Sequence, residues 1–204
     1  MKQKQKDMPM TLSSSTNPLH TMSVEEIDNL FENVSVSQTW QWKESTFADT
    51  GQGKDYLDET EIGARNFLRN SADYHVIPKK LLRRSKTALS EIMSNVDKHL
   101  KGGRKFISIT IGYIPYEDKP AIIICLKNSA NERHYKRCKE AIKQSRKAIE
   151  NSKEELNALS DRLMENPNPG GLGFWNLITQ IRAEVACDYN AERDILRTTC
   201  LLRG

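Results

Sequence analysis

The sequence predicts an α+β fold that is mostly α-helical, with a β-hairpin at about 105–127 packed against helices and a C-terminal αα-hairpin. Three observations support this class. Isoleucines alternate with other residues over 107–111 and an apolar run follows at 121–126, a pattern typical of two paired strands. Apolar residues recur at helical spacing through most of the remaining chain. The run NPNPGGLG at 166–173 breaks a long helix-compatible segment in two.

The N-terminal part of the chain is predicted to lie outside the folded domain. Residues 1–22 read as a disordered tail, because they have too few apolar side chains to offset the entropy lost on ordering. Residues 23–55 are predicted to be a partner-docking arm that begins with a short amphipathic helix capped by Ser23. The alternative is that this helix docks on the domain itself. The residues predicted to bind a protein partner, within 23–42, are Ile27, Leu30, Phe31, Val34, Trp40 and Trp42.

A single folded α+β domain is expected over 56–204. Its first helices are predicted at about 58–69 and 79–101, and the second of these starts after Pro78, a residue favoured at helix starts. The strands of the hairpin follow. A lone two-stranded hairpin is marginally stable in water, so the helices are expected to cover it.

The last part of this domain is predicted to be two antiparallel helices. The first spans 131–165 and repeats apolar and small residues in a heptad register over 135–163. That register fits either an intramolecular helical pair or a homo-oligomer formed through the same helix. The second helix begins at about 174, after the glycine-rich break, and completes the αα-hairpin.

The positive charge is concentrated in the middle of the chain. Residues 79–147 hold 18 Lys and Arg against 6 Asp and Glu, a net +12, whereas the whole chain carries +4. Such an imbalance favours an anionic partner, with a plain solvated helix surface as the alternative. The residues predicted to contact a nucleic-acid backbone, without reading its sequence, are Lys79, Lys80, Arg83, Arg84, Lys86, Arg104, Lys105, Arg133, Lys136, Arg137, Lys143, Arg146 and Lys147.

The stretch PKKLLRRSK at 78–86 carries further expectations. Four scattered cysteines and the lack of a signal-peptide pattern predict a cytoplasmic protein. A basic cluster of this length also fits a nuclear-import signal, and the spacing of Ile27, Leu30, Val34 and Val36 fits a nuclear-export signal, so shuttling to the nucleus is an added prediction. Ser85 follows two arginines and is a predicted phosphorylation site, where a phosphate would add about −1.5 to −2 charges. RNA, DNA, an anionic membrane surface and an acidic protein all remain open as the anionic partner.

Catalytic and metal-binding signals are weak. The sequence contains no phosphate-binding GxxxxGK[ST], no GxSxG and no HExxH, so no catalytic residue and no cofactor are predicted. Cys125, His134 and Cys138 form a weak zinc-like group, with buried thiols as the favoured interpretation. The longest apolar run, 121–126, is far shorter than the roughly 20 residues of a membrane span. The expected function is a non-enzymatic nucleic-acid-binding protein; the alternative is a structural or assembly protein, such as a small virus-encoded matrix or accessory factor.

Overall fold

The structure is a computed structural model that describes residues 24–32, 34–43, 53–75, 77–100, 106–115, 120–151 and 171–204, together with isolated residues between 152 and 165. Among these residues, none of the helices is both long enough and apolar enough to cross a membrane.

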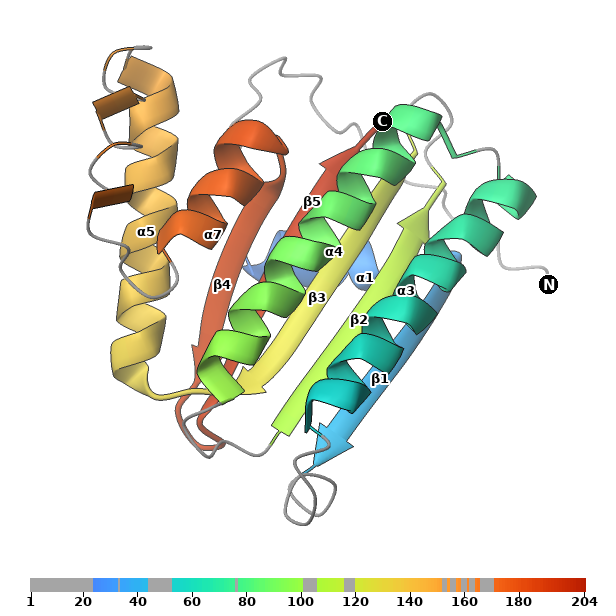
Figure 1. Ribbon diagram of the computed structural model, residues 1–204, viewed down its shortest axis with the longest axis horizontal. Helices are drawn as coiled ribbons and strands as arrows, with labels where there is room; N and C mark the ends of the chain where they lie inside the picture. The colour runs from blue at the N-terminus through green and yellow to red at the C-terminus, as the bar shows by residue number, and fades with distance from the viewer. Residues whose placement is uncertain are drawn as a thin grey trace, which may run out of the picture.

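A five-stranded antiparallel sheet forms the centre of the molecule (Figure 1). Its strands lie in the order β1-β2-β3-β5-β4. Their bounds are β1 (Val36–Lys43), β2 (Phe106–Ile114), β3 (Ala121–Ser129), β4 (Glu184–Asn190) and β5 (Ile195–Arg203). The last strand of the chain therefore lies inside the sheet, between β3 and β4.

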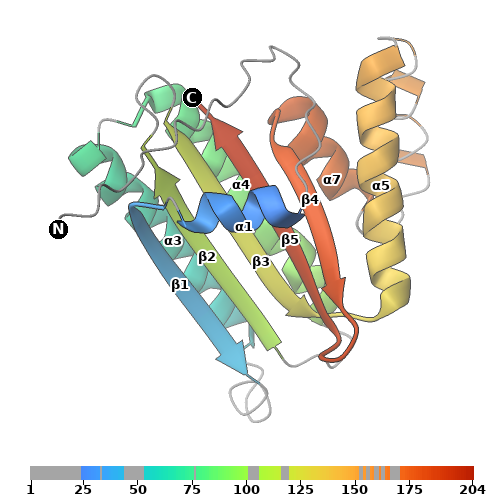
Figure 2. The same ribbon diagram turned by 180° about the vertical axis from the view of Figure 1, so that it is seen from behind.

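Helices cover both faces of this sheet unequally. On one face lie α3 (Gly53–His75), α4 (Lys79–Leu100), α7 (Gly171–Trp175) and the π-helical turn η1 (Asn176–Gln180) (Figure 1). The helix α5 (Glu132–Asn151) stands beside β4 at one edge. On the opposite face α1 (Val24–Glu32) crosses the strands (Figure 2).

The isoleucine pattern explains why β2 and β3 form the middle of the sheet. Successive side chains of a strand point to opposite faces. In β2, Ile107, Ile109 and Ile111 are all at most 1% exposed and pack in the core beneath α3 and α4. Both faces of β3 are covered, since Ile122 and Ile124 belong to that core while Ile123 packs in a second core. This double burial accounts for the uninterrupted apolar run of β3.

The second core lies under α1. Leu30 of α1 is buried there, and Val34 packs on the same cluster. Gly112 in β2 makes this approach possible: a Cβ built on it would lie 2.8 Å from Val34 Cγ1 and 3.0 Å from Ile123 Cγ2. Part of the segment predicted to be a docking arm thus packs on the sheet of its own chain.

The predicted fold class is wrong in its balance of helix and strand. The hairpin expected at 105–127 is present as β2 and β3, which pair antiparallel, but three further strands extend it. Instead of one helix after residue 174, the chain forms α7, η1, β4 and β5. The predicted C-terminal αα-hairpin is therefore absent from the described residues.

Tertiary pairing explains this error. Residues 184–203 contain Ala, Glu, Arg and Leu, which favour helices, but intrinsic preferences differ by less than about 1 kcal/mol per residue. Pairing of β5 with both β3 and β4 buries Cys200 and Leu202 completely, and this packing outweighs local preference. Asp194, in the turn between the two strands, adopts a φ of 50°. Reversal at this turn brings β4 and β5 together.

The structure contains the other helices that the sequence predicts. The helix expected at 79–101 is confirmed as α4, and the one at 58–69 lies within the longer α3. The helix predicted from residue 131 is confirmed as α5 up to Asn151, and most of its predicted continuation lies outside the described residues. The Cys138 and Ile142 positions of its heptad register pack on the core of the same chain.

Candidate anion-binding groove

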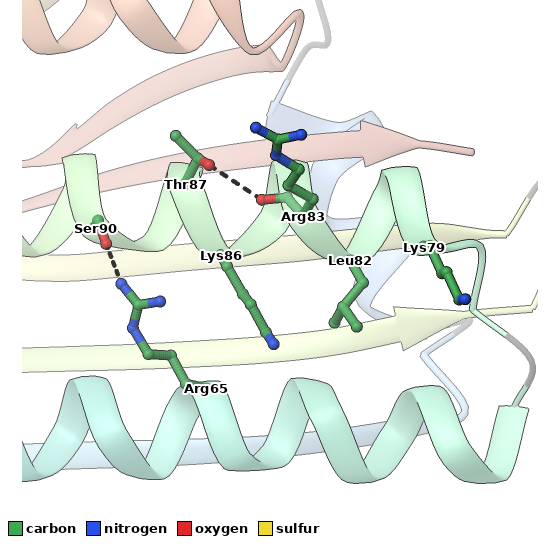
Figure 3. Close-up of a pocket in the computed structure, with 7 residues that line it drawn as sticks. All are labelled: Arg65, Lys79, Leu82, Arg83, Lys86, Thr87 and Ser90. Atoms are coloured by element: carbon green, nitrogen blue, oxygen red, sulfur yellow. Dashed lines mark hydrogen bonds between the residues drawn. The ribbon is translucent and has the colours of Figure 1, made fainter.

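A groove between α3 and α4 opens on the outer surface of the helical layer (Figure 3). Its volume is about 410 Å³. The lining residues are Arg65, Lys79, Leu82, Arg83, Lys86, Thr87 and Ser90. Four of these seven side chains are cationic, so the hollow concentrates positive charge.

The amphipathic character of α4 places these cations outside. One side of the helix buries Leu81, Ala88 and Leu89 against the sheet, each at 1% exposure or less. Residues at the intervening positions must then face solvent or the neighbouring helix. Figure 3 shows Lys79, Leu82 and Lys86 projecting toward α3, while Arg83 projects from the other side of α4 and forms the rim.

The wall formed by α3 is partly neutralised. Arg65 forms an ion pair with Glu61, one turn earlier, with 2.5 Å between Nη2 and Oε1. Arg65 also donates to the Ser90 hydroxyl, which itself donates to Glu61 at 2.9 Å. By contrast, no carboxylate of the described residues pairs with Lys79, Arg83 or Lys86. These three cations supply the free positive charge of the groove.

The hydroxyls of the groove are already used as donors. Thr87 donates to the backbone carbonyl of Arg83 at 3.1 Å, and Ser90 donates to Glu61. Their remaining lone pairs can only accept hydrogen bonds. An anion in this groove would therefore be held by ammonium and guanidinium groups, which are the side chains that bind phosphate.

Two residues of the 78–86 stretch, Arg84 and Ser85, form hydrogen bonds within the protein and do not line the groove. Arg84 donates to the carbonyls of Ile181, Arg203 and Arg182 at 2.9, 2.7 and 2.9 Å. Partial burial lowers the pKa of this guanidinium. Ser85 has no exposed surface and donates to the carbonyl of Leu81 at 2.9 Å. Phosphorylation of Ser85 would require α4 to separate from the sheet.

The basic residues of α5 form a separate group. Arg133, Lys136, Arg137, Lys143 and Lys147 are exposed. In Figure 1, α7 lies between α4 and α5, so the two sets of cations do not share the groove.

The other residues predicted to form the basic surface bind groups of the same chain, lie away from the hollow, or fall outside the described residues. Lys136 pairs with Glu132 at 2.9 Å, and Arg146 donates to the backbone carbonyl of Val185 in β4. Lys80 is exposed at the start of α4 without lining the hollow. Arg104 and Lys105 lie outside the described residues.

The predicted partner-binding residues that can be placed contact their own chain. Leu30 and Val34 pack under α1, as described above. Trp40 of β1 meets Phe67 of α3 edge to face, with 6.3 Å between ring centroids. The side chains of Ile27, Phe31 and Trp42 lie outside the described part of the structure.

The zinc-like group does not assemble among the described residues, where no cluster of three or more His, Cys, Asp or Glu could hold a metal ion. Cys125 is buried in β3, whereas Cys138 of α5 lies near Cys187 of β4. Burial raises the pKa of Cys138 to about 12 and that of Cys187 to about 11. Both thiols are therefore protonated at neutral pH.

A second polar cluster, which the sequence did not reveal, joins α4 to α7 and η1. Asn176 donates to Glu91 at 3.1 Å. A Cβ at Gly173 would lie 2.1 Å from Asn95 Nδ2, so a larger residue there would require the Asn95 side chain to move. In the sequence, only the glycines of NPNPGGLG could have indicated this close approach, because Glu91 and Asn95 belong to no recognisable motif. The π-helical turn beside this cluster is a rare conformation that recurs at functional sites.

Comparison of the chain with protein-family models, with curated proteins and with solved structures found no match.

Proposed function

We propose that this protein binds the phosphate backbone of nucleic acid through the groove between α3 and α4. The observation that carries the proposal is that Lys79 and Lys86 project into one hollow with Arg83 at its rim, each without a carboxylate partner among the described residues. Unpaired cations bind phosphates and release the counterions that surround a nucleic acid.

The composition of the groove supports backbone contact without recognition of base sequence. Leu82 is the one apolar residue that lines it, and no aromatic side chain is among the lining residues. Stacking on aromatic rings is the usual means of holding unpaired bases. Lysine and arginine side chains that contact phosphates position a nucleic acid but do not read its sequence.

The test is a salt titration of binding. Fluorescence anisotropy of the full chain would be measured with a labelled single-stranded RNA and with a labelled DNA duplex. In Lys79→Gln/Lys86→Gln, two phosphate contacts are lost. We expect the slope of log affinity against log salt to fall by about 2 for the duplex, since each contact contributes about 0.9. Comparison of the two probes decides between RNA and DNA.

A matched control removes the same charge elsewhere. Arg133→Gln/Arg137→Gln changes two exposed cations of α5, and we expect a slope close to that of the unaltered chain. An equal decrease of this slope in both variants would show that nucleic acid is attracted by the overall charge of the protein and that the groove is not the binding site. Absence of binding to either probe at low salt rejects the proposal. Binding to phosphatidylserine vesicles alone would assign the groove to membranes.

The alternative of an assembly protein draws support from a different observation, the exposed edge of β1.

A further inference from the structure

The two edges of the sheet differ in protection. At the β4 edge, α5 covers the strand: Arg146 donates to the carbonyl of Val185, and Tyr135 stacks on Tyr189 with 5.8 Å between ring centroids. At the other edge, β1 pairs with β2 and with no other described segment. Both ribbon views show β1 as the outermost strand (Figures 1 and 2). No described segment pairs with its outward N–H and C=O groups.

The strand β1 lacks the features that usually prevent edge pairing. Edge strands are commonly protected by proline, charges, bulges or short length. Here eight residues pair in unbroken register from Val36 opposite Tyr113 to Lys43 opposite Phe106. The strand contains no proline, and its only charge is on the final residue. Such a strand is a template for a further strand.

We infer that the chain forms a two-fold dimer in which β1 pairs antiparallel with β1 of a second copy, making a continuous ten-stranded sheet. The strand complements itself. Ser37, Thr39 and Gln41 are exposed on one face, so small polar side chains would meet other polar side chains. Antiparallel pairing also places the Lys43 of each copy toward opposite ends, where the two charges do not face each other.

The alternation of side chains restricts the register. Directly opposed residues of antiparallel strands point to the same face, so paired residue numbers must differ by an even number. The two central registers place either Thr39 or Trp40 opposite itself. In the first, Ser37 faces Gln41 of the second copy. In the second, Ser37 faces Lys43.

The difference between the edges also sets the size of the assembly. Because α5 covers the β4 edge, each chain has one free sheet edge among its described residues, and pairing at that edge closes at two copies. Opposed strands keep their faces, so both helical layers lie on the same side of the joined sheet. The two grooves, with the α3 helices of both copies between them, would then be on the order of 20 Å apart, about two helix diameters. Their use as a bivalent phosphate surface rests on the proposed function; the dimer itself does not.

Sedimentation velocity of the full chain, without nucleic acid, tests the dimer. Over roughly a hundredfold range of concentration, we expect the mass to rise from 23.4 kDa toward twice that value. In Ser37→Lys/Gln41→Lys, both central registers place like charges opposite each other. We expect the dissociation constant to rise at least about tenfold. Both positions are exposed, so the folded chain should tolerate the change.

The matched control is Ser94→Lys/Gln144→Lys, which changes the same residue types at exposed positions on α4 and α5. We expect it to dimerise like the unaltered chain. In the variants that form the dimer, the β1 amides should become more protected from hydrogen exchange as the protein concentration rises. In variants that do not dimerise, this protection should not change with concentration. A chain that stays monomeric throughout overturns the inference. A dimer that persists unchanged in Ser37→Lys/Gln41→Lys also overturns it, and would point to another interface.

Discussion

Two consecutive arginines of α4 have opposite surroundings. A helix turns by about 100° per residue, so neighbours in sequence point in different directions. Arg83 faces solvent at the rim of the groove. Arg84 turns toward the end of η1 and the end of β5, where it donates to three backbone carbonyls. The same kind of side chain is thus available for the proposed anion contact at one position and attaches distant segments of the chain at the other.

Replacement of Arg84 by lysine tests this structural role. An ammonium keeps the charge but cannot reach three carbonyls with the planar fork of a guanidinium. Hydrogen bonds to a charged group contribute about 1.5–3 kcal/mol. We expect Arg84→Lys to lower the free energy of unfolding by an amount in that range, measured by urea denaturation.

The neighbouring arginine is the natural control for this measurement. Arg83→Lys changes an exposed side chain and should alter stability by less than about 0.5 kcal/mol. Equal unfolding midpoints for the two variants would mean that the carbonyl contacts of Arg84 do not stabilise the fold.

At the scale of elements, α1 illustrates how one small residue permits a helix to pack. The sheet can accept Val34 because Gly112 has no side chain. This contact decides whether α1 behaves as part of the domain or as a detachable arm. Amide hydrogen exchange throughout α1 as fast as in an unfolded chain would show that α1 behaves as a detachable arm.

Gly112→Ala should push α1 away from the sheet. The added methyl would lie 2.8 Å from Val34 Cγ1, and overpacking of this kind costs about 1–3 kcal/mol. We expect lower stability in urea and faster hydrogen exchange in α1. The change in β2 itself should be small, since alanine is compatible with a strand.

A double-mutant cycle separates this contact from other effects of the substitution. Val34→Ala removes the opposing methyls, so Gly112→Ala/Val34→Ala should be less destabilised than the sum of the single changes. Strict additivity would show that the two positions do not contact each other in solution.

At the scale of the whole molecule, the end of the chain holds the sheet together. β5 pairs with β3 on one side and with β4 on the other. Arg203 forms an ion pair with Glu184 at 2.7 Å, and the Gly204 N–H donates to the Pro120 carbonyl at 2.8 Å. Loss of β5 would disconnect β4 from the rest of the sheet.

Deletion of residues 195–204 should therefore abolish cooperative unfolding. The truncated chain would expose the core faces of β3 and β4, and we expect a broad thermal transition by circular dichroism and loss of dispersed NMR signals. Deletion of Gly204 alone removes one hydrogen bond and should leave a cooperative transition. If the 195–204 deletion unfolds as sharply as the full chain, the C-terminus is not a central strand.

Local patterns predicted those features whose causes are local. Alternating isoleucines and a following apolar run identified β2 and β3, which are adjacent in sequence and joined by a short connection. Pro78 and the apolar spacing after it identified α4, and with it three of the four cations that line the groove. These predictions required no knowledge of distant residues.

Only the tertiary structure decided the remaining strands and the other half of the groove. The partner of Val36 is Tyr113, and the partner of Ile122 is Leu202; no neighbouring residue signals such pairings. Arg65 enters the groove because α3 packs beside α4, and Arg84 leaves it because η1 and β5 end nearby. Local preferences differ by less than about 1 kcal/mol per residue, so burial against distant segments determines both strand identity and side-chain surroundings.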